Sequence, residues 1–296
     1  MDWDNLKVAL AISRLGSLTQ AAQALGIDQS TAGRRLTALE GDLGTILFVR
    51  SKTGFALTDA GEAAINQAIE VERRIDRLRD AVTPSESGPA GTVRLLGNHW
   101  TLDRLARTTM GAFLQRHPRL DLRLITLTPR SRMRGEASLS IWFEVEPRES
   151  EFAIKLGDVP YAVYRAHNAD EAELGWISFY DEDAARPIVA RAHKRLRSRG
   201  EPLRMTATDA GIMLSAVRHG VGKALLPMCL AEGDDQLVRV KEGEPELIRA
   251  LHLHAHPDTV EAARIQATIR WLRESFQSVF LPANHAPCAG KVAEAP

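Results

Sequence analysis

The segment that most constrains this chain is residues 18–40, which reads LTQAAQALGIDQSTAGRRLTALE. It has the spacing of two short helices joined by a tight turn. Ala22 is small enough for the point where the helices cross, and Gly26 tolerates the backbone angles of the turn. Ala32 and Leu36 are spaced to bury one face of the second helix. The pattern predicts a helix-turn-helix, although a helical hairpin of another kind can carry Ala and Gly at these places.

Polar residues around this segment predict where its helices begin. Ser17 and Gln20 have capping-box spacing for the first helix, and Asp28 is placed to N-cap the second. The outward positions of the second helix are short, polar or basic, which suits base edges and phosphates. The candidate DNA contacts there are Gln29, Ser30, Thr31, Gly33, Arg34 and Arg35.

A β-hairpin is predicted directly after the helix-turn-helix. Residues 47–50 lead into a basic turn over residues 51–54, and residues 55–57 form the second strand before a new helix begins near Thr58. A strand, a basic turn and a strand beside a helix-turn-helix indicate a wing. The candidate DNA contacts of the wing are Arg50, Lys52 and Thr53.

Four short blocks of this region resemble the LysR-type transcriptional regulators. They are LGIDQ ending at Gln29, LTALE ending at Glu40, LGTILFVR ending at Arg50 and LTDAG ending at Gly61. The resemblance is specific over about the first eighty residues and looser to about residue 280.

The resemblance implies how this region meets DNA. Residues 29–35 would enter the major groove, while Arg50 and the wing would contact the backbone and the minor groove. The chain departs from the family pattern at Asp28, where a neutral polar residue is usual, and at Gly33, where Ser is frequent. These departures concern the detail of base recognition.

An unbroken helical pattern follows over residues 58–82. Its apolar residues recur every three or four positions, which is a heptad seam, and Ile65 and Ile69 widen the stripe. So long a seam beside a small domain favours dimerisation over packing on its own domain. The resemblance implies the same, with further pairing into tetramers. The predicted seam is Ala64, Ala68, Val71, Ile75, Leu78 and Val82.

The rest of the chain reads as a linker and an α/β domain. Residues 83–91, TPSESGPAG, form a hinge between a winged domain over 1–57 with its helix over 58–82 and a regulatory domain over 92–281. Strand-like runs at 92–96, 120–127, 139–143, 176–179 and 203–206 alternate with helical runs at 102–116, 213–219 and 260–280. This alternation favours mostly parallel sheets. Residues 282–296 are expected to be a disordered tail.

A ligand site is expected in the regulatory domain. Residues 91–95 and 220–227 resemble the opening strand and the Gly-rich loop of the family's effector domain, which implies two α/β subdomains around a cleft, as in periplasmic binding proteins. Ligands in such folds sit beyond strand ends, against helix N-termini. Helix starts favour an anion and aromatic rings add an apolar wall, so we expect a small organic acid; the alternative is a cleft filled by its own side chains. The candidate effector-binding residues are Asn98, His99, Trp100, Thr101, Trp142, Phe143, Thr208 and Asp209.

Composition narrows the class of protein. No stretch approaches the roughly 20 apolar residues of a membrane span, and the N-terminus is acidic where a signal peptide is basic, so a cytoplasmic location is expected. Cys229 and Cys288 do not suggest a disulfide framework. The formal net charge is +0, and the first 82 residues hold 10 Lys and Arg against 11 Asp and Glu, so DNA binding must depend on where the charges sit.

Other chemistry has little support. His252, His254 and His256 would share one face of a predicted strand, but without Cys or carboxylate ligands nearby they read as structural residues rather than as a metal site. Phosphate-loop, dinucleotide and nucleophile-elbow motifs are lacking in the sequence. No catalysis, cofactor or metal is therefore expected.

The sequence and the resemblance together predict a ligand-responsive transcriptional regulator. Its architecture would be a winged helix-turn-helix, a long linker helix and a two-subdomain α/β effector domain. The expected partners are double-stranded DNA with an inverted-repeat operator, a small-molecule effector and further copies of the chain in a homodimer or homotetramer, with RNA polymerase as a further candidate and no membrane. The alternative is an effector-independent architectural or silencing DNA-binding protein.

Overall fold

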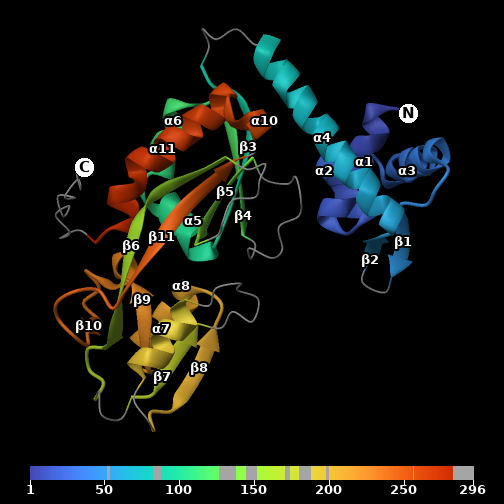
Figure 1. The fold of residues 1–296 in the computed structure, drawn as a ribbon. Coiled ribbons are helices and arrows are strands. Elements are labelled where there is room, and N and C mark those ends of the chain that lie inside the picture. The colour runs from blue at the N-terminus through green and yellow to red at the C-terminus, as the bar shows by residue number, and fades with distance from the viewer. Residues whose placement is uncertain are drawn as a thin grey trace, which may run out of the picture. The chain divides into compact units, whose positions relative to one another are not determined.

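The computed structural model describes residues 1–51, 54–82, 88–126, 138–144, 152–170, 174–179, 188–197, 200–255 and 257–282. Two compact units divide the chain near residue 84 (Figure 1). None of the helices in these ranges is long and apolar enough to cross a membrane.

The first unit is a helix-turn-helix with a β-hairpin and a long helix. Its elements are α1 (Trp3–Leu15), α2 (Leu18–Leu25), α3 (Gln29–Leu43), β1 (Phe48–Ser51), β2 (Gly54–Leu57) and α4 (Asp59–Val82). The first three helices each end at a left-handed glycine, and Gly26 makes the predicted turn with a φ of 66°. Ala22, Ala32 and Leu36 are buried in the core, as their spacing predicts.

The helix starts agree only in part with the predicted caps. The Ser17 hydroxyl accepts a hydrogen bond from the Gln20 backbone N–H at 3.5 Å, which is the first half of a capping box. Asp28 occupies the N-cap position of α3, but its side chain makes no capping hydrogen bond. Asp28 therefore occupies the predicted position, but the predicted capping hydrogen bond is wrong. The first N–H groups of α3 receive no hydrogen bond from the Asp28 carboxylate.

The second unit contains one sheet with helices on its faces. Its strands are β3 (Gly91–Gly97), β4 (Leu120–Thr126), β5 (Leu139–Phe143), β6 (Phe152–Ala166), β7 (Trp176–Phe179), β8 (Leu203–Ala207), β9 (Lys223–Pro227), β10 (Leu237–Arg239) and β11 (Leu247–Ala255). Its helices are α5 (His99–Thr108), α6 (Met110–Arg116), α7 (Ile188–Leu196), α8 (Ala210–Arg218), α9 (Met228–Ala231), α10 (Pro257–Val260) and α11 (Ala263–Phe280).

The sheet is mixed, whereas the sequence favoured a mostly parallel one. The strand order is β4-β3-β5-β11-β6-β9-β7-β8, with β10 beside β6. β3 pairs in parallel with β4 and β5, and β7 pairs in parallel with β8 and β9. β11 and β6 run antiparallel to their neighbours between these two parallel groups. The parallel groups form two lobes, and β6 passes from one to the other (Figure 1).

The long strand β6 escaped the sequence reading because Gly157 and Pro160 interrupt its apolar pattern. Packing requires that glycine: a Cβ at Gly157 would lie 2.1 Å from the Phe276 ring of α11. The predicted helix over 102–116 is likewise two helices, because the chain leaves helical geometry at Thr109. The Thr109 hydroxyl accepts a hydrogen bond from the Trp271 indole at 3.1 Å, which ties this break to α11.

Candidate functional site

The exposed side of α3 carries only part of the predicted set. Gln29, Ser30 and Arg34 are exposed, and the Arg34 guanidinium donates to the Thr31 hydroxyl at 3.4 Å. These side chains form a polar surface at the start of the helix.

The other two predicted positions of α3 face protein. The Arg35 guanidinium lies 3.7 Å from the carboxylate of Asp4 on α1. Lys7 and, more weakly, Arg35 hold the pKa of that Asp4 carboxyl below its ordinary value. A Cβ at Gly33 would sit 3.7 Å from Leu18 of α2. Arg35 and Gly33 therefore face α1 and α2, and a side chain at position 33 would have ordinary contact distances there.

The wing is anchored to the helix-turn-helix through its backbone. β1 and β2 pair antiparallel with Arg50 opposite Phe55. Phe55 donates its N–H to the Gly16 carbonyl at 3.0 Å, and a Cβ at Gly54 would lie 2.4 Å from that same oxygen. The described residues include the backbone of Arg50 but not its side chain, and Lys52 and Thr53 lie outside them.

Residues in the family-like blocks hold this arrangement together. One carboxylate oxygen of Glu40 accepts from the N–H groups of Leu47 at 2.8 Å and Phe48 at 3.3 Å. Thr58 accepts from the Gly61 N–H at 2.9 Å, which starts α4, and donates to the Ile46 carbonyl at 2.8 Å. The sequence analysis considered these blocks only for DNA contacts. It did not predict that Glu40 and Thr58 position the hairpin and the start of α4.

Helix α4 has two different halves. Ala68, together with Ile65 and Ile69, is buried in the core of its own unit, and Ala64 packs against that core. Further along the helix, Ile75 is half-buried, whereas Val71 and Leu78 are 38% and 63% exposed; nothing is described of the Val82 side chain. The seam predicted for a partner thus begins as an intramolecular contact, and Val71 and Leu78 are its exposed members among the described side chains.

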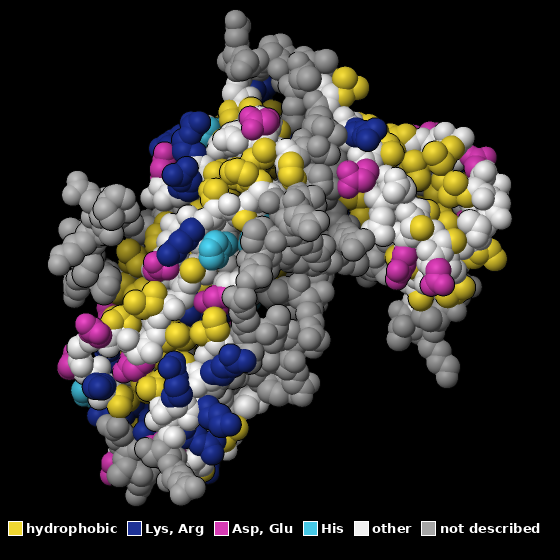
Figure 2. Space-filling view, in the orientation of Figure 1, with side chains coloured by type: hydrophobic (Ala, Val, Ile, Leu, Met, Phe, Trp, Pro, Cys, Tyr) yellow, Lys and Arg dark blue, Asp and Glu magenta, His cyan; other side chains and the backbone are white. Residues whose placement is uncertain are grey.

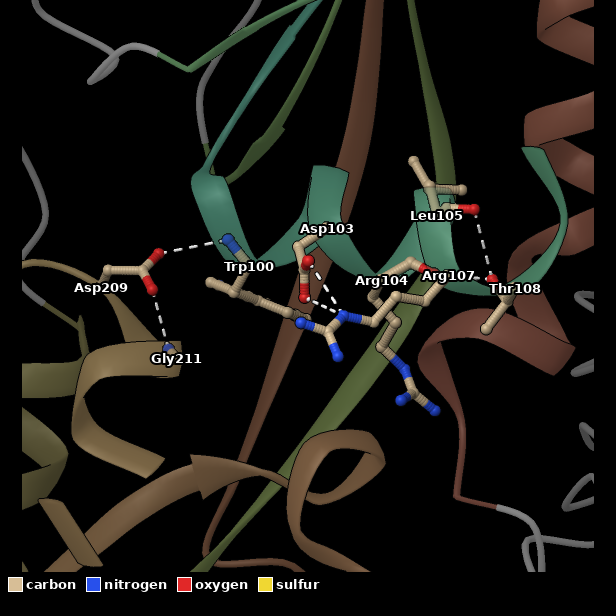
Figure 3. A network of polar contacts seen from close by, with 8 residues as sticks. All are labelled: Trp100, Asp103, Arg104, Leu105, Arg107, Thr108, Asp209 and Gly211. Atoms are coloured by element: carbon tan, nitrogen blue, oxygen red, sulfur yellow. Dashed lines mark hydrogen bonds and ion pairs between the residues drawn. The ribbon is translucent and has the colours of Figure 1, made fainter. Parts of the chain in front are cut away.

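A single carboxylate joins the two helix starts at which a ligand is expected. Asp209 N-caps α8, accepting from the Gly211 N–H at 2.8 Å, and its other oxygen accepts from the Trp100 N–H of α5 at 3.2 Å (Figure 3). α5 belongs to one lobe and α8 to the other. The place where both helices direct N–H groups is therefore occupied by a carboxylate of the chain itself.

Aromatic rings pack around the side chain of Trp100, whose backbone N–H meets this carboxylate. Trp100 is 4% exposed, and its ring stacks on Phe143 with centroids 5.7 Å apart. Phe280 of α11 meets the Trp100 ring edge-on at 6.1 Å. Trp142 is fully buried, but as the neighbour of Phe143 on β5 it points to the opposite face of the sheet. The sequence analysis placed Trp142 and Phe143 in one wall of a cleft. That prediction is wrong, because the two side chains lie on opposite faces of the sheet.

The remaining candidate effector residues differ in access. Thr101 is fully buried and donates its hydroxyl to the Asn98 carbonyl at 2.8 Å. Asn98 occupies the N-cap of α5 without a side-chain capping bond and is half-buried, while His99 and Thr208 are exposed. Of the eight candidates, Trp100, Phe143 and Asp209 form the connected group.

A partly buried ion pair adjoins that group and was not predicted from the sequence. The Arg249 guanidinium donates to both oxygens of Glu144, with the closest contact at 2.7 Å, and lies 4.4 Å from the centroid of the Phe143 ring. Arg249 also donates to the Tyr161 hydroxyl at 3.3 Å. Burial raises the pKa of Tyr161 to about 12 despite the opposing charge of Arg249. No sequence signal links positions 144 and 249, because β5 and β11 bring them together only in the folded sheet.

The predicted histidine face contains no complete metal site within the described ranges. His252 and His254 have ring centroids 6.4 Å apart and pair across the ladder with Trp142 and Ser140; His256 lies outside those ranges. The described residues contain no group of three or more His, Cys, Asp or Glu suited to a metal ion. Cys229 is buried, and that burial raises the pKa of its thiol to about 12.

Comparisons with known proteins match both units. Residues 3–62 fit the family described as "Bacterial regulatory helix-turn-helix protein, lysR family", and residues 86–277 fit the "LysR substrate binding domain". The transcriptional regulator YofA of Bacillus subtilis is 27% identical over 259 residues, covering 81% of this chain and 86% of YofA. The transcriptional activator IlvY of Salmonella typhimurium is 24% identical over 255 residues, with the same coverages of 81% and 86%.

Solved structures share the fold. A full-length OxyR variant from Pseudomonas aeruginosa covers 97% of this chain and 99% of its own, at 16% identity and a TM-score of 0.70. Full-length CbnR complexed with its target DNA covers 93% of this chain and 100% of its own, at 15% identity and a TM-score of 0.60.

Proposed function

Since the chain belongs to the LysR family of bacterial helix-turn-helix regulators, we propose that it reads an operator through the start of α3 and responds to a small organic acid bound between its two lobes. Its relatives are transcriptional regulators, and it is a DNA-binding regulator rather than an enzyme. The proposal continues to a cytoplasmic location, an inverted-repeat operator and a homodimer or homotetramer, with RNA polymerase as a further partner.

The DNA part is supported by the exposed start of α3. Gln29, Ser30 and Arg34 present amide, hydroxyl and guanidinium groups to solvent, which are the groups that read base edges in the major groove. Arg50 and Lys52 belong to the wing and would contact phosphates. Alanine at Gln29 or Arg34 should change sequence preference, whereas alanine at Arg50 or Lys52 should weaken binding to every sequence and lower the salt slope by about one for each lost phosphate contact. Salt titrations on selected and random duplexes test this, and unchanged affinity in all four variants would refute it.

The effector part is carried by one observation: the Asp209 carboxylate accepts from N–H groups of both α5 and α8. A position that binds an internal carboxylate has the donors and the helix dipoles to bind a free one. An acid entering there must displace Asp209, and it would then join or separate the same two helices. Trp100 and Phe143 would form the apolar wall against its body.

The test compares the wild type with Asp209→Ser. Serine retains an N-cap for α8, but it cannot extend a second oxygen to α5, so the internal competitor is removed. A panel of aliphatic and aromatic carboxylates should raise the melting temperature of Asp209→Ser at lower concentrations than for the wild type. Matched neutral amides should have no effect on either protein. Absence of binding to both proteins would refute the sensing function and leave an effector-independent DNA-binding protein.

A further inference from the structure

Asp28, the N-cap residue of α3, has no role in the function proposed above. Its backbone angles are extended, and its carbonyl accepts from the Ala32 N–H at 2.9 Å, so α3 begins with normal N-cap geometry. The residue is exposed. Within the described part of the chain, its carboxylate has no hydrogen bond and no ion pair. The side chain is therefore available to a partner outside the chain.

Other aspartates at helix starts of this chain are used as caps. Asp2 accepts from the Asp4 N–H of α1 at 3.0 Å, and Asp209 accepts from the Gly211 N–H of α8 at 2.8 Å. Each of these carboxylates stabilises the helix that it starts. The Asp28 carboxylate gains only from the dipole of α3, so a capping hydrogen bond does not account for an acid at this position.

Asp28 lies at the edge of the surface that is proposed to meet bases. Gln29 and Ser30 follow it directly and are exposed. The exposed Arg34 donates to the Thr31 hydroxyl at 3.4 Å and forms no ion pair with Asp28. The first residues of a recognition helix are those that contact base edges in the major groove. A carboxylate that no cation of the chain neutralises thus stands beside the groups expected to enter that groove.

A negative charge at this place weakens attraction to every duplex. The first 82 residues already hold 10 Lys and Arg against 11 Asp and Glu, and Figure 2 shows acidic side chains among apolar ones on the drawn face of the first unit. A further carboxylate beside phosphates is repelled by them. Such a group contributes to recognition by discrimination, because it raises the free energy of the complexes with wrong partners.

The pattern of donors and acceptors in the major groove determines which base suits a carboxylate. An ionised carboxylate accepts hydrogen bonds and has none to donate. Guanine presents the two acceptors N7 and O6, thymine presents the acceptor O4, and adenine presents the acceptor N7 beside its amino group. Cytosine alone presents a donor, its N4 amino group, without an acceptor. The carboxylate is therefore attracted to cytosine and meets a repelling acceptor on each of the other three bases.

We propose that Asp28 reads cytosine. Its carboxylate accepts a hydrogen bond from the N4 amino group of one cytosine in each half-site and disfavours the other three bases at that position. The inference rests on DNA binding through α3 and adds one defined base to the sequence that this helix reads.

The experiment uses the full chain and the sequences that it selects from a pool of random duplexes. The test variants are Asp28→Ala, which removes the acceptor, and Asp28→Asn, which keeps the shape and adds a donor. The control is Asp42→Asn, which removes the same charge near the other end of α3, where Asp42 pairs with the N-terminal amine of Met1 at 3.2 Å. The two aspartates are about 21 Å apart along the helix axis, which is more than two Debye lengths of about 8 Å.

The wild type and the control should select cytosine at one position of each half-site. Asp28→Ala should accept all four bases at that position, and Asp28→Asn should shift towards adenine, whose N6 and N7 suit an amide. Preferences at the other positions should stay the same. Asp28→Ala should also bind random duplexes more tightly than the wild type, because a repelled charge is removed.

A modified base tests the proposed hydrogen bond directly. Replacing the selected cytosine by 2-pyrimidinone removes the N4 amino group and keeps pairing with guanine. This replacement should weaken binding of the wild type by about tenfold and binding of Asp28→Ala by less than about twofold. Fluorescence anisotropy on the two duplexes measures both changes.

Three outcomes overturn the proposal. The first is that the wild type and Asp28→Ala select the same sequences, and the second is that the position that depends on Asp28 is not cytosine in the wild type. The third is a melting temperature of Asp28→Ala clearly below that of Asp42→Asn, which would show that the carboxylate caps α3. Failure of the wild type to select any sequence would instead refute reading by α3 itself, a result distinct from selection that does not depend on Asp28.

Discussion

The two units of this regulator differ in how they hold their candidate binding groups. In the first unit, Gln29, Ser30 and Arg34 are exposed at a helix start that its N-cap residue Asp28 leaves without a side-chain bond. In the second unit, the starts of α5 and α8 share the carboxylate of Asp209, and Trp100 beside them is buried. A duplex that binds as proposed would meet side chains that are already exposed on the first surface. A small ligand at the second site must displace groups that are already satisfied, so its binding is coupled to a change of structure.

The largest effect is expected within α4, whose first half packs in the core of its own unit and whose later half carries exposed apolar residues. Ile69 is 4% exposed in the core of the first unit and Leu78 is 63% exposed. Ile69→Asp should lower the free energy of unfolding of that unit by about 3–5 kcal/mol, because it buries an unpaired carboxylate and leaves a cavity. Urea titration followed by circular dichroism measures this change.

Leu78→Glu is the matched substitution on the outward half. It should change the free energy of unfolding of an isolated chain by less than about 0.5 kcal/mol, as at other surface sites, while reducing assembly in sedimentation experiments. Equal destabilisation by both substitutions would show that α4 has no outward half. A fully assembled Leu78→Glu protein would place the subunit contact elsewhere.

A smaller effect is expected at the shared carboxylate. Asp209→Ala removes acceptors from two helix starts and should lower the free energy of unfolding of the second unit by about 2 kcal/mol. This is within the usual range for a lost N-cap and a lost charge-assisted hydrogen bond. Asp209→Ser should recover about half of this loss, because serine caps α8 alone. Calorimetry of the three proteins measures both steps. If Ala and Ser behave alike, the contact with α5 dominates, and if Ser matches the wild type, the two lobes are not joined by Asp209.

Features that depend on residues close in sequence could be predicted from the sequence. The helix-turn-helix is local: Ala22, Gly26 and Leu36 are close in sequence, and steric rules for crossing helices and turns fix their roles. The strands at 139–143 and 176–179 were also predictable, because continuous apolar runs mark buried strands. The pattern on α4 gave the apolar stripe but not its partner, since intramolecular and intermolecular packing require the same period.

The polar contacts of the second unit could not be predicted in the same detail. Asp209 and Trp100 are 109 residues apart, and Arg249 and Glu144 are 105 apart. Polar pairing between residues so far apart in sequence depends on the order and direction of the strands. The sequence predicted mostly parallel strands and did not predict their order. Without the antiparallel pairing of β11 with β5 and β6, Arg249 has no predicted neighbour. Sequence reasoning therefore named both helix starts and Asp209 as candidates, but not that the Asp209 carboxylate accepts from both helices.

Neighbouring arginines on α3 offer a sharper test of the outward surface. Arg34 is exposed, whereas Arg35 lies 3.7 Å from Asp4. Arg34→Ala should weaken binding to the selected duplex by about 1–3 kcal/mol and relax its sequence preference. Arg35→Ala should weaken binding by less than about 1 kcal/mol and leave preference unchanged, because that side chain faces α1. Fluorescence anisotropy on matched and mismatched duplexes distinguishes them, and the reverse order of effects would mean that Arg35 leaves Asp4 when DNA binds.

The smallest effect is expected from the titration of His193, a histidine that faces the protein interior. Burial lowers the pKa of His193, with a further contribution from Arg197 and opposition from Glu201. The folded protein therefore favours the neutral ring, and protonation favours the unfolded chain. Stability from this group is complete above the unfolded pKa of about 6.5 and declines as the pH falls through and below that value. Between pH 7.5 and pH 5.5 the free energy of unfolding should fall more in the wild type than in His193→Gln, which cannot titrate. Paired urea titrations at the two pH values cancel the contributions of other groups. A larger fall in His193→Gln would mean that the folded protein stabilises the charged ring, and the buried environment described for α7 would be wrong.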